Sequence, residues 1–245
     1  APLVVLAAAT PSDCFNMAYE SCRIALKYMI PVILLSDGYI ANGSEPWKIP
    51  DIDSLPEIET RLTKKKEGFA PFQHDNPNLP RPWALPGTPG MEHRVGGLEK
   101  WEETGHVSYD PENHQKMVEL RQQKVDVIAN DIALAKAFGK GNGDLLVIGW
   151  GGTHGALRSA VETAQENGMS VSHLHLRHLN PLPRNLGEIL VKFQKVMIAE
   201  LNMGQLAAII RSKFLVDAVS LNKIQGKPFT ITEVFNKITE LVKGA

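Results

Sequence analysis

The chain has 245 residues, of which 43% are hydrophobic and 22% charged, and this is the composition of a globular protein with one large domain or two small ones. Its formal net charge of −1 gives no electrostatic reason to expect nucleic acid or an anionic lipid surface as a partner. No stretch approaches the roughly 18 apolar residues that a membrane span needs. We therefore expect a protein that binds neither nucleic acid nor a membrane.

The chain opens with a predicted strand at 3–9, a helix at 12–29 and a second strand at 32–35. Thr10 can cap this helix, and Pro31 ends it. The result is one βαβ unit, and two parallel strands cannot by themselves make a sheet that is covered on both faces. We therefore expect the opening residues to need strands that the chain does not supply, and the chain to be a fragment of a larger protein.

Both cysteines, Cys14 and Cys22, fall on the first predicted helix, eight residues apart. At about 1.5 Å per residue their Cα atoms lie about 12 Å apart, which is too far for a disulfide. Two thiols on one helix indicate a reducing compartment, so we expect the protein in the cytoplasm.

The regular pattern is lost from about residue 39 to residue 110. Six prolines within residues 71–90 exclude long helices and interior strands: Pro71, Pro77, Pro80, Pro82, Pro86 and Pro89. An irregular segment of this length is either disordered or a functional surface segment. Disordered linkers are poor in aromatic residues, whereas this one holds Trp47, Phe69, Phe72, Trp83 and Trp101. We therefore expect it to lie ordered against a domain or a partner.

Trp47 stands out within this segment because it follows a turn shaped by Gly43 and Pro46. Two interpretations remain open. The side chain is suited to a contact between subunits, and it is equally suited to simple burial in the core.

A helix is predicted over 112–138, with Val125, Ile128, Ile132 and Ala135 on one apolar stripe. We expect this helix to bridge the two halves of the chain.

From residue 144 onward, strands and helices alternate. The predicted strands are 145–150, 171–176, 196–200 and 218–221, and the predicted helices are 153–165, 186–193, 205–214 and a last helix that Thr230 and Glu233 begin with a capping box. Short connections between alternating strands and helices predict an α/β fold with a doubly wound, mostly parallel sheet. We expect this part to fold alone, and we divide the chain into residues 1–50, 51–143 and 144–245.

A glycine-rich motif, GWGGTHG, lies between a predicted strand and a predicted helix at 149–155. Backbone N–H groups at such a turn can hold an anion, which makes Gly151, Gly152, Thr153 and His154 candidate anion-binding residues. The motif has neither the dinucleotide-binding spacing nor a Walker lysine. A tight turn with Thr153 as the helix cap is the alternative.

Three histidines, His173, His175 and His178, follow in the pattern H-x-H-x-x-H. Alternation along a strand puts the first two on one face, but no carboxylate or cysteine lies beside them, so we predict polar residues at a sheet surface and no metal site. His154 is expected to be an exposed polar group. Because no nucleophile has an attendant base and no G-x-S-x-G motif is present, we predict no catalytic residue in this chain.

Several separated motifs resemble one family. Residues 10–15 (TPSDCF) and 31–39 (PVILLSDGY) resemble the end of the pyrimidine-binding domain in alpha subunits of 2-oxoacid:ferredoxin oxidoreductases. Residues 105–115 (GHVSYDPENHQ), 175–183 (HLRHLNPLP) and 200–206 (ELNMGQL) resemble the 2-oxoglutarate branch. The resemblance covers essentially the whole chain.

The resemblance implies oxidative decarboxylation of 2-oxoglutarate to succinyl-CoA with reduction of ferredoxin. It implies thiamine diphosphate, Mg²⁺ and an iron–sulfur cluster in the full complex, with the diphosphate and the cluster on a partner beta subunit and none of them on this fragment alone. Residues 1–50 would be the tail of the pyrimidine-binding domain, and residues 144–245 would be a transketolase C-terminal-like domain that frames the site. We expect an oligomer whose isolated fragment is inactive.

Two alternatives stay open at this point. The same family also acts on pyruvate and on branched-chain 2-oxoacids, and the substrate pocket is not expected in this chain. The other alternative is a stand-alone α/β protein that binds a nucleotide or another anion at 149–155. The resemblance implies a Gly-Ser-Thr sequence where this chain has Gly151-Gly152-Thr153. If that serine contacts a ligand, the glycine at position 152 makes the same contact less expected here.

Overall fold

A computed structural model describes residues 2–74 and 80–244; Pro77 of the proline-rich stretch lies outside them. The chain folds as two compact units. The first unit comprises residues 1–4, 19–33 and 49–131, and the second comprises residues 5–18, 34–48 and 132–245. The three-part division of the sequence by position therefore differs from the division in space, where the second unit combines short segments from the beginning of the chain with its last 114 residues.

A four-stranded parallel sheet forms the centre of the second unit. Its strands are β5 (Gly143–Trp150), β6 (Val171–Leu176), β8 (Phe193–Glu200) and β9 (Ala218–Asn222), in the order β6-β5-β8-β9. All three neighbouring pairs are parallel. The predicted α/β fold with a mostly parallel sheet is confirmed.

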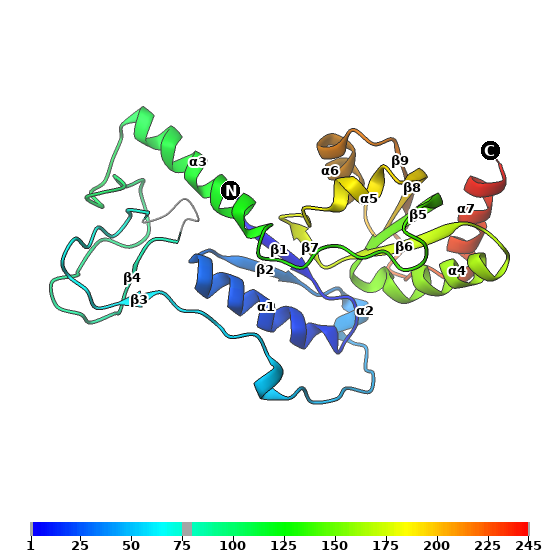
Figure 1. Cartoon of the computed structure of the whole chain (residues 1–245), viewed down its shortest axis with the longest axis horizontal. Coiled ribbons are helices and arrows are strands. Elements are labelled where there is room, and N and C mark those ends of the chain that lie inside the picture. Colours follow the sequence, from blue (N-terminus) through cyan, green and yellow to red (C-terminus); the bar gives the residue numbers. More distant parts are fainter. Residues whose placement is uncertain (1, 75–79, 245) are drawn as a thin grey trace. The chain divides into compact units, whose positions relative to one another are not determined.

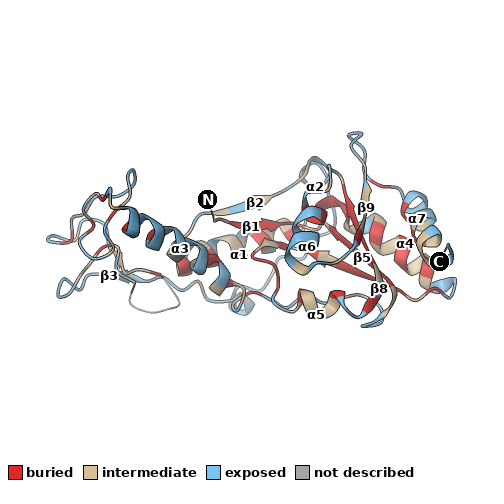
Figure 2. Cartoon of the chain, turned by 90° about the horizontal axis from the view of Figure 1, so that it is seen from above, coloured by how far each residue is buried: buried red, intermediate tan, exposed pale blue. Residues whose placement is uncertain are grey.

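Two pairs of helices cover the two faces of this sheet (Figure 1). Helices α4 (His154–Glu166) and α7 (Ile231–Lys243) lie on one face, and α5 (Leu186–Leu190) and α6 (Gln205–Phe214) lie on the other. Leu145 and Val147 belong to the first core, whereas Leu146 and Ile148 belong to the second, as alternation along a strand requires. Figure 2 shows the strands as the most continuously buried part of the unit.

The helix that the sequence predicts over 186–193 is too long. It ends at Leu190, and Phe193 begins strand β8, where it pairs with Gly143. Phe193 is buried in the core on that face. Aromatic side chains pack well on a half-buried pleated surface, and this burial outweighs the continuation of a short helix.

The capping box that begins α7 is confirmed. The Glu233 N–H donates to Thr230 Oγ1 at 3.2 Å, and the Thr230 N–H donates to a Glu233 carboxylate oxygen at 2.7 Å.

Thr230→Ala removes the hydroxyl that accepts the Glu233 N–H and so breaks the capping box. It is therefore expected to lower the free energy of unfolding by about 1 kcal/mol. Urea unfolding measures this loss. Thr232→Ala, which changes an exposed threonine in the same helix, is the control, and an equal loss there would contradict the role of the cap.

The first segment contains β1 (Val4–Ala7), α1 (Asp13–Tyr28), β2 (Val32–Leu35) and the short helix α2 (Gly38–Ala41), all close to the predicted bounds except for the unpredicted α2. The expectation that the chain supplies no further strand here is wrong. A short strand, β7 (His178–Asn180), pairs antiparallel with β1, giving the sheet order β2-β1-β7. Only Arg177 separates β7 from β6, so the two strands look like one run in the sequence.

The irregular segment is mostly without secondary structure, as predicted. It has a 3-10 turn at Ile52–Ser54, two-residue parallel strands β3 (Leu62–Thr63) and β4 (Trp83–Ala84), and then helix α3 (Pro111–Ile128). The part of the chain that the structure describes contains no helix that is long and apolar enough to cross a membrane.

Ring contacts hold part of this segment. The Phe69 and Phe72 rings pack edge-on against the His93 ring, with centroids 5.6 and 6.3 Å away. Trp47 and Trp101 are still 47% and 44% exposed. Trp47 contacts the Phe15 ring at 5.3 Å between centroids, so full burial in the core is not its role.

Helix α3 ends ten residues earlier than the sequence predicts. After Ile128 the backbone tightens, because the N–H groups of residues 129–131 bond three residues back. Asp131 then accepts hydrogen bonds from Arg23 Nη1 at 2.8 Å and from Tyr28 Oη at 2.9 Å. Ile132 is buried like the apolar residues of α3, although it is not part of the helix. Its apolar side chain at helical spacing is the reason why the sequence predicts a longer helix. All of α3 lies in the first unit.

Candidate functional site

The glycine-rich motif lies at the carboxyl end of β5, the end of the strands at which open α/β sheets bind ligands. A 3-10 turn at Gly151–Thr153 separates β5 from α4. Gly151 has φ of +60°, which favours glycine. Thr153 does not cap the helix with its side chain; its Oγ1 donates to the Trp150 carbonyl at 2.8 Å. The Thr153 side chain therefore stabilises the 3-10 turn that precedes α4.

A carboxylate of the chain itself faces this turn. The Gly152 N–H donates to Asp37 Oδ2 at 2.6 Å, and Asp37 Oδ1 accepts the Ile40 N–H at 2.9 Å at the start of α2. A Cβ on residue 152 would lie 2.5 Å from Asp37 Oδ2. The contact therefore explains why glycine stands at this position, and an internal anion satisfies this N–H.

A second contact joins two motifs that are far apart in the sequence. Asp13 is buried, and its Oδ1 accepts Arg177 Nη1 at 2.9 Å while its Oδ2 accepts the Ala9 N–H at 3.0 Å. The Ala7 N–H also donates to the Arg177 carbonyl at 2.8 Å. The TPSDCF segment and the HLRHLNPLP segment are thus joined by one ion pair inside the second unit, and β1, just before TPSDCF, adds a backbone hydrogen bond to the same arginine.

Glu200 is a functional-looking residue that the sequence reasoning passed over. Its side chain is fully buried at the end of β8. Its oxygens accept four N–H groups, from Trp150 Nε1, Asn202 Nδ2, Leu206 N and Ala207 N, at 3.0 to 3.1 Å. The ELNMGQL motif, with its acid six residues before the first N–H of α6 that it accepts, is the signal that points to it.

The strand order makes these contacts informative. Strands β5 and β8 are neighbours whose chain connections run to opposite sides, which is where open α/β sheets have the crevice that receives ligands. Here the indole of Trp150 reaches Glu200 across that edge. The turn before α4 and the start of α6 each hold an internal carboxylate, Asp37 and Glu200 respectively.

The histidines form a compact cluster. Ring centroids of His154 and His175 lie 4.8 Å apart, and His173 lies 5.7 Å from each of them. The sequence correctly places His173 and His175 together, but the prediction of polar residues at a sheet surface is wrong, because His173 and His178 are buried. His154 is half-buried against the first two and is not an exposed group. Within residues 2–74 and 80–244, no group of three or more His, Cys, Asp or Glu side chains is arranged to hold a metal ion.

Burial keeps this cluster uncharged. It lowers the pKa of His173 to about 3 and the pKa of His175 well below its usual value, and neighbouring His154 adds to both shifts. Burial also lowers the pKa of His154. The rings therefore act as neutral aromatic packing under the glycine-rich turn.

Acidification is expected to destabilise the second unit through these histidines. Below pH 6.5 the unfolded chain protonates them while folded His173 stays neutral down to about pH 3, so stability is present above pH 6.5 and is lost as the pH falls. Each such histidine contributes a slope of up to about 1.4 kcal/mol per pH unit. Urea midpoints between pH 6.5 and 4.5 should fall less steeply for His173→Leu, and parallel slopes would contradict the assignment.

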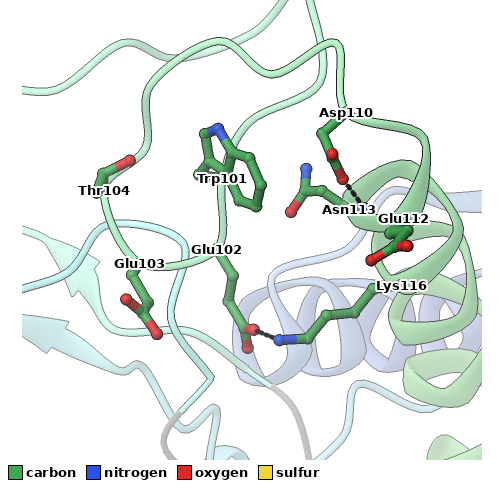
Figure 3. A pocket seen from close by; sticks show the side chains of 8 residues that line it. All are labelled: Trp101, Glu102, Glu103, Thr104, Asp110, Glu112, Asn113 and Lys116. Carbon is green, nitrogen blue, oxygen red and sulfur yellow. Dashed lines mark hydrogen bonds and ion pairs between the residues drawn. The ribbon is translucent and has the colours of Figure 1, made fainter.

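The GHVSYDPENHQ motif forms the start of α3 in the first unit. Asp110 Oδ1 caps the helix by accepting the Asn113 N–H at 2.7 Å, and buried Asn113 donates to the Lys100 carbonyl at 3.0 Å. Asp110 and Asn113 line a cavity of about 410 Å³. Figure 3 shows both side chains, together with the ion pair between Lys116 and Glu102. The motif is therefore explained by helix capping and loop attachment.

Comparison with known proteins places this architecture. Residues 1–113 match the family described as "Pyruvate flavodoxin/ferredoxin oxidoreductase, thiamine diP-bdg", and residues 143–234 match "Pyruvate:ferredoxin oxidoreductase core domain II". The chain is 48% identical, over 99% of its length, to the 2-oxoglutarate oxidoreductase subunit KorA of Mycobacterium tuberculosis. It belongs to the 2-oxoacid:ferredoxin oxidoreductase family.

Other members of the 2-oxoacid:ferredoxin oxidoreductase family are more distant. The alpha subunit of 2-oxoacid:ferredoxin oxidoreductase 1 from Aeropyrum pernix is 28% identical over 99% of this chain. The structure of a 2-oxoglutarate:ferredoxin oxidoreductase from Magnetococcus marinus matches 98% of this chain with a TM-score of 0.90 and 29% identity. The chain spans 37% of the M. tuberculosis relative, 39% of the A. pernix relative and 42% of the M. marinus chain.

The cofactors of this family can be tested against the residues present. The chain has two cysteines, both free thiols, whereas an iron–sulfur cluster takes about four. No metal-ligand group occurs among the residues that the structure describes, and the N–H of Gly152 already faces Asp37. These residues fit neither a cluster nor a Mg²⁺-bound diphosphate.

Proposed function

We propose that this chain is part of the alpha subunit of an enzyme that oxidatively decarboxylates 2-oxoglutarate to succinyl-CoA and reduces ferredoxin. The observation that carries the proposal is the 48% identity, over nearly the whole chain, to a 2-oxoglutarate oxidoreductase subunit. The M. marinus structure that matches 98% of the chain contains 2-oxoglutarate, coenzyme A and succinyl-CoA, which supports the same substrate class.

In this proposal the chain frames a site and does not carry the reacting groups. Residues 1–50 are the end of a pyrimidine-binding domain, 51–143 are the irregular segment with its helix, and 144–245 are a transketolase C-terminal-like domain. The Asp13–Arg177 and Asp37–Gly152 contacts support a framing role. They join segments that match the two different families of domain into one compact unit.

The remaining parts of the proposed enzyme come from partners. A beta subunit would bind thiamine diphosphate, Mg²⁺ and the iron–sulfur cluster, and ferredoxin would receive the electrons from the complex. Trp47, about half exposed, is a candidate contact between subunits in the proposed oligomer. The two free thiols, Cys14 and Cys22, suit a cytoplasmic enzyme.

The competing function is a stand-alone protein that binds a nucleotide or phosphate at Gly151, Gly152, Thr153 and His154. It is the less favoured proposal because Asp37 already accepts the Gly152 N–H and would repel a phosphate there. Calorimetry with ATP, ADP and inorganic phosphate separates the two. We expect no saturable heat from this site. The same titrations are made with Asp37→Asn, which removes the negative charge beside the Gly152 N–H and would make a weak phosphate site easier to detect. Saturable binding that Gly152→Ala abolishes would favour the competing function.

Association with a partner tests the proposed function itself. The tagged chain, mixed with the separately expressed beta subunit of the same organism, is expected to elute with it in one complex on size-exclusion chromatography. Alone, the chain is expected not to reduce methyl viologen with 2-oxoglutarate and coenzyme A. A chain that elutes apart from the beta subunit at micromolar concentration, or that is active alone, would contradict the proposal.

A further inference from the structure

A cavity of about 620 Å³ lies in the first unit, and all of its lining residues belong to that unit. Helix α3 supplies Met117, Leu120, Arg121 and Lys124, and the irregular segment supplies most of the other walls. Phe72 and Leu98 add apolar surface. The cavity thus combines an apolar wall with several charged groups, which is the usual character of a small-molecule site.

Four cations line this cavity, and three of them, Arg81, Lys100 and Lys124, are held by something other than a carboxylate. Arg81 Nη1 donates to the Pro71 carbonyl at 2.7 Å, and its guanidinium lies 4.2 Å from the centre of the Phe72 ring. Buried Lys100 donates to the carbonyls of Gly96 and Leu98. Lys124 donates weakly to the Met29 carbonyl, at 3.4 Å.

The carboxylates near the cavity are engaged elsewhere. Glu99 accepts both terminal nitrogens of Arg121, at 3.1 and 3.2 Å, and His114 Nδ1 at 2.9 Å. Glu102 pairs with Lys116 and lies 3.4 Å from His74 Nδ1. Within the described residues, this leaves Arg81, Lys100 and Lys124 as positive charges without an ion-pair partner.

Lys124 is repelled by positive charges close to it. Burial, together with the positive charges of Arg81 and Arg121, lowers the pKa of Lys124 to about 8. Burying a charge without a counter-charge is costly. A sequence under no other constraint would replace one of these cations or place an acid among them. The arrangement is accounted for if an anion completes it.

We propose that this cavity binds a small organic anion, whose phosphate or carboxylate oxygens are held by Arg81, Lys100 and Lys124 and whose apolar part lies against Phe72 and Met117. Arginine and lysine both suit such oxygens, because their N–H bonds to an oxyanion are stronger than neutral hydrogen bonds. The site is distinct from the glycine-rich turn, and it does not depend on the reaction proposed above.

Calorimetry with the whole chain tests the proposal. Inorganic pyrophosphate represents phosphate ligands, and adipate represents carboxylate ligands with an apolar body. At least one is expected to bind with a Kd below about 1 mM, and the tighter of the two identifies the oxyanion. Lys124→Met, which keeps the length of the side chain and removes its charge, is expected to weaken binding about tenfold or more, whereas Lys124→Arg is expected to keep it.

Lys64→Met is the matched control, because it removes the same charge from an exposed position of the same unit. It should leave the affinity within about twofold. The absence of saturable binding by either probe would overturn the proposal, and so would equal losses in the Lys64→Met and Lys124→Met variants. Equal losses in the two variants would mean that the affinity depends only on the overall charge of the unit and not on the position of Lys124.

Proton uptake provides a readout that a merely adventitious anion would not give. An anion beside Lys124 favours its charged form, so binding at pH 8 should take up a fraction of a proton, because the pKa of free Lys124 is about 8. At pH 6 Lys124 is already charged, and its uptake should vanish. Titrations in buffers of different ionisation enthalpy measure this, and Lys124→Met should remove the difference between the two pH values. The other charged or titratable groups that line the cavity are His74, Arg81, Glu99, Lys100 and Arg121.

Discussion

Replacing Gly152 with alanine is expected to lower the free energy of unfolding of the second unit by about 2–4 kcal/mol. The new Cβ would lie 2.5 Å from Asp37 Oδ2 and 3.0 Å from its Cγ, so the carboxylate must move away. This movement breaks the 2.6 Å hydrogen bond from the Gly152 N–H and weakens the cap of α2 at Ile40. Urea unfolding followed by far-ultraviolet circular dichroism measures the loss.

Gly155→Ala is the matched control for this substitution. An added Cβ at Gly155 meets no atom within 4 Å, and alanine is the better helix former, so the control should be neutral or slightly stabilising. Asp37→Ala combined with Gly152→Ala tests the cause, because the alanine at 152 then has no carboxylate to displace. Losses that simply add in the double variant would show that the contact with Asp37 is not the reason for glycine at this position.

Glu200→Ala is expected to have the larger effect, a loss of about 3–5 kcal/mol. The substitution leaves three buried donors without their acceptor, namely the Trp150 indole N–H and the N–H groups of Leu206 and Ala207 at the start of α6. An unsatisfied buried donor costs about 1–3 kcal/mol, and water entering the space recovers part of it. Thermal unfolding should shift by several degrees.

Glu166→Ala, which changes an exposed glutamate at the end of α4, is the control and should change stability by less than about 0.5 kcal/mol. Fluorescence gives a second readout. Because the Trp150 indole N–H donates to Glu200, the emission of Trp150 should change in Glu200→Ala and not in Glu166→Ala. A variant as stable as the wild type, with unchanged emission, would contradict the buried network.

The parallel sheet was predictable from the sequence for a physical reason. Its strands are short apolar runs because helices cover both faces, and each run is followed by a turn and an amphipathic helix. Two elements of this part of the chain, β6 and α6, have the predicted bounds. The capping box of α7 is local chemistry within four residues, so it could also be predicted.

The site geometry was not predictable in the same way, because its contacts are non-local. Asp37 and Gly152 are 115 residues apart, and Asp13 and Arg177 are 164 apart. Nothing in the periodicity of either segment indicates its partner. The sequence showed only a glycine at position 152, which allows another group to come close to the backbone but does not say that this group is a carboxylate of the same chain.

Strand β7 and the end of α3 illustrate the other limit. β7 follows β6 after a single residue and bonds to a strand from the start of the chain, so local pattern reads both as one strand. In α3 the apolar stripe continues to Ile132 although the helix stops at Ile128, because burial and helical conformation are separate properties. Tertiary contacts at Asp131 decide where the helix ends.

The measurement that tests the central claim most directly is the substrate preference of the complete enzyme. The proposed alpha subunit is assembled with its proposed beta subunit, and ferredoxin or methyl viologen reduction is followed with coenzyme A and each of three acids. The account predicts a kcat/KM for 2-oxoglutarate that is at least about tenfold above the values for pyruvate and 2-oxoisovalerate. A preference for pyruvate or the branched-chain acid, or an assembled complex that oxidises none of them, would contradict it.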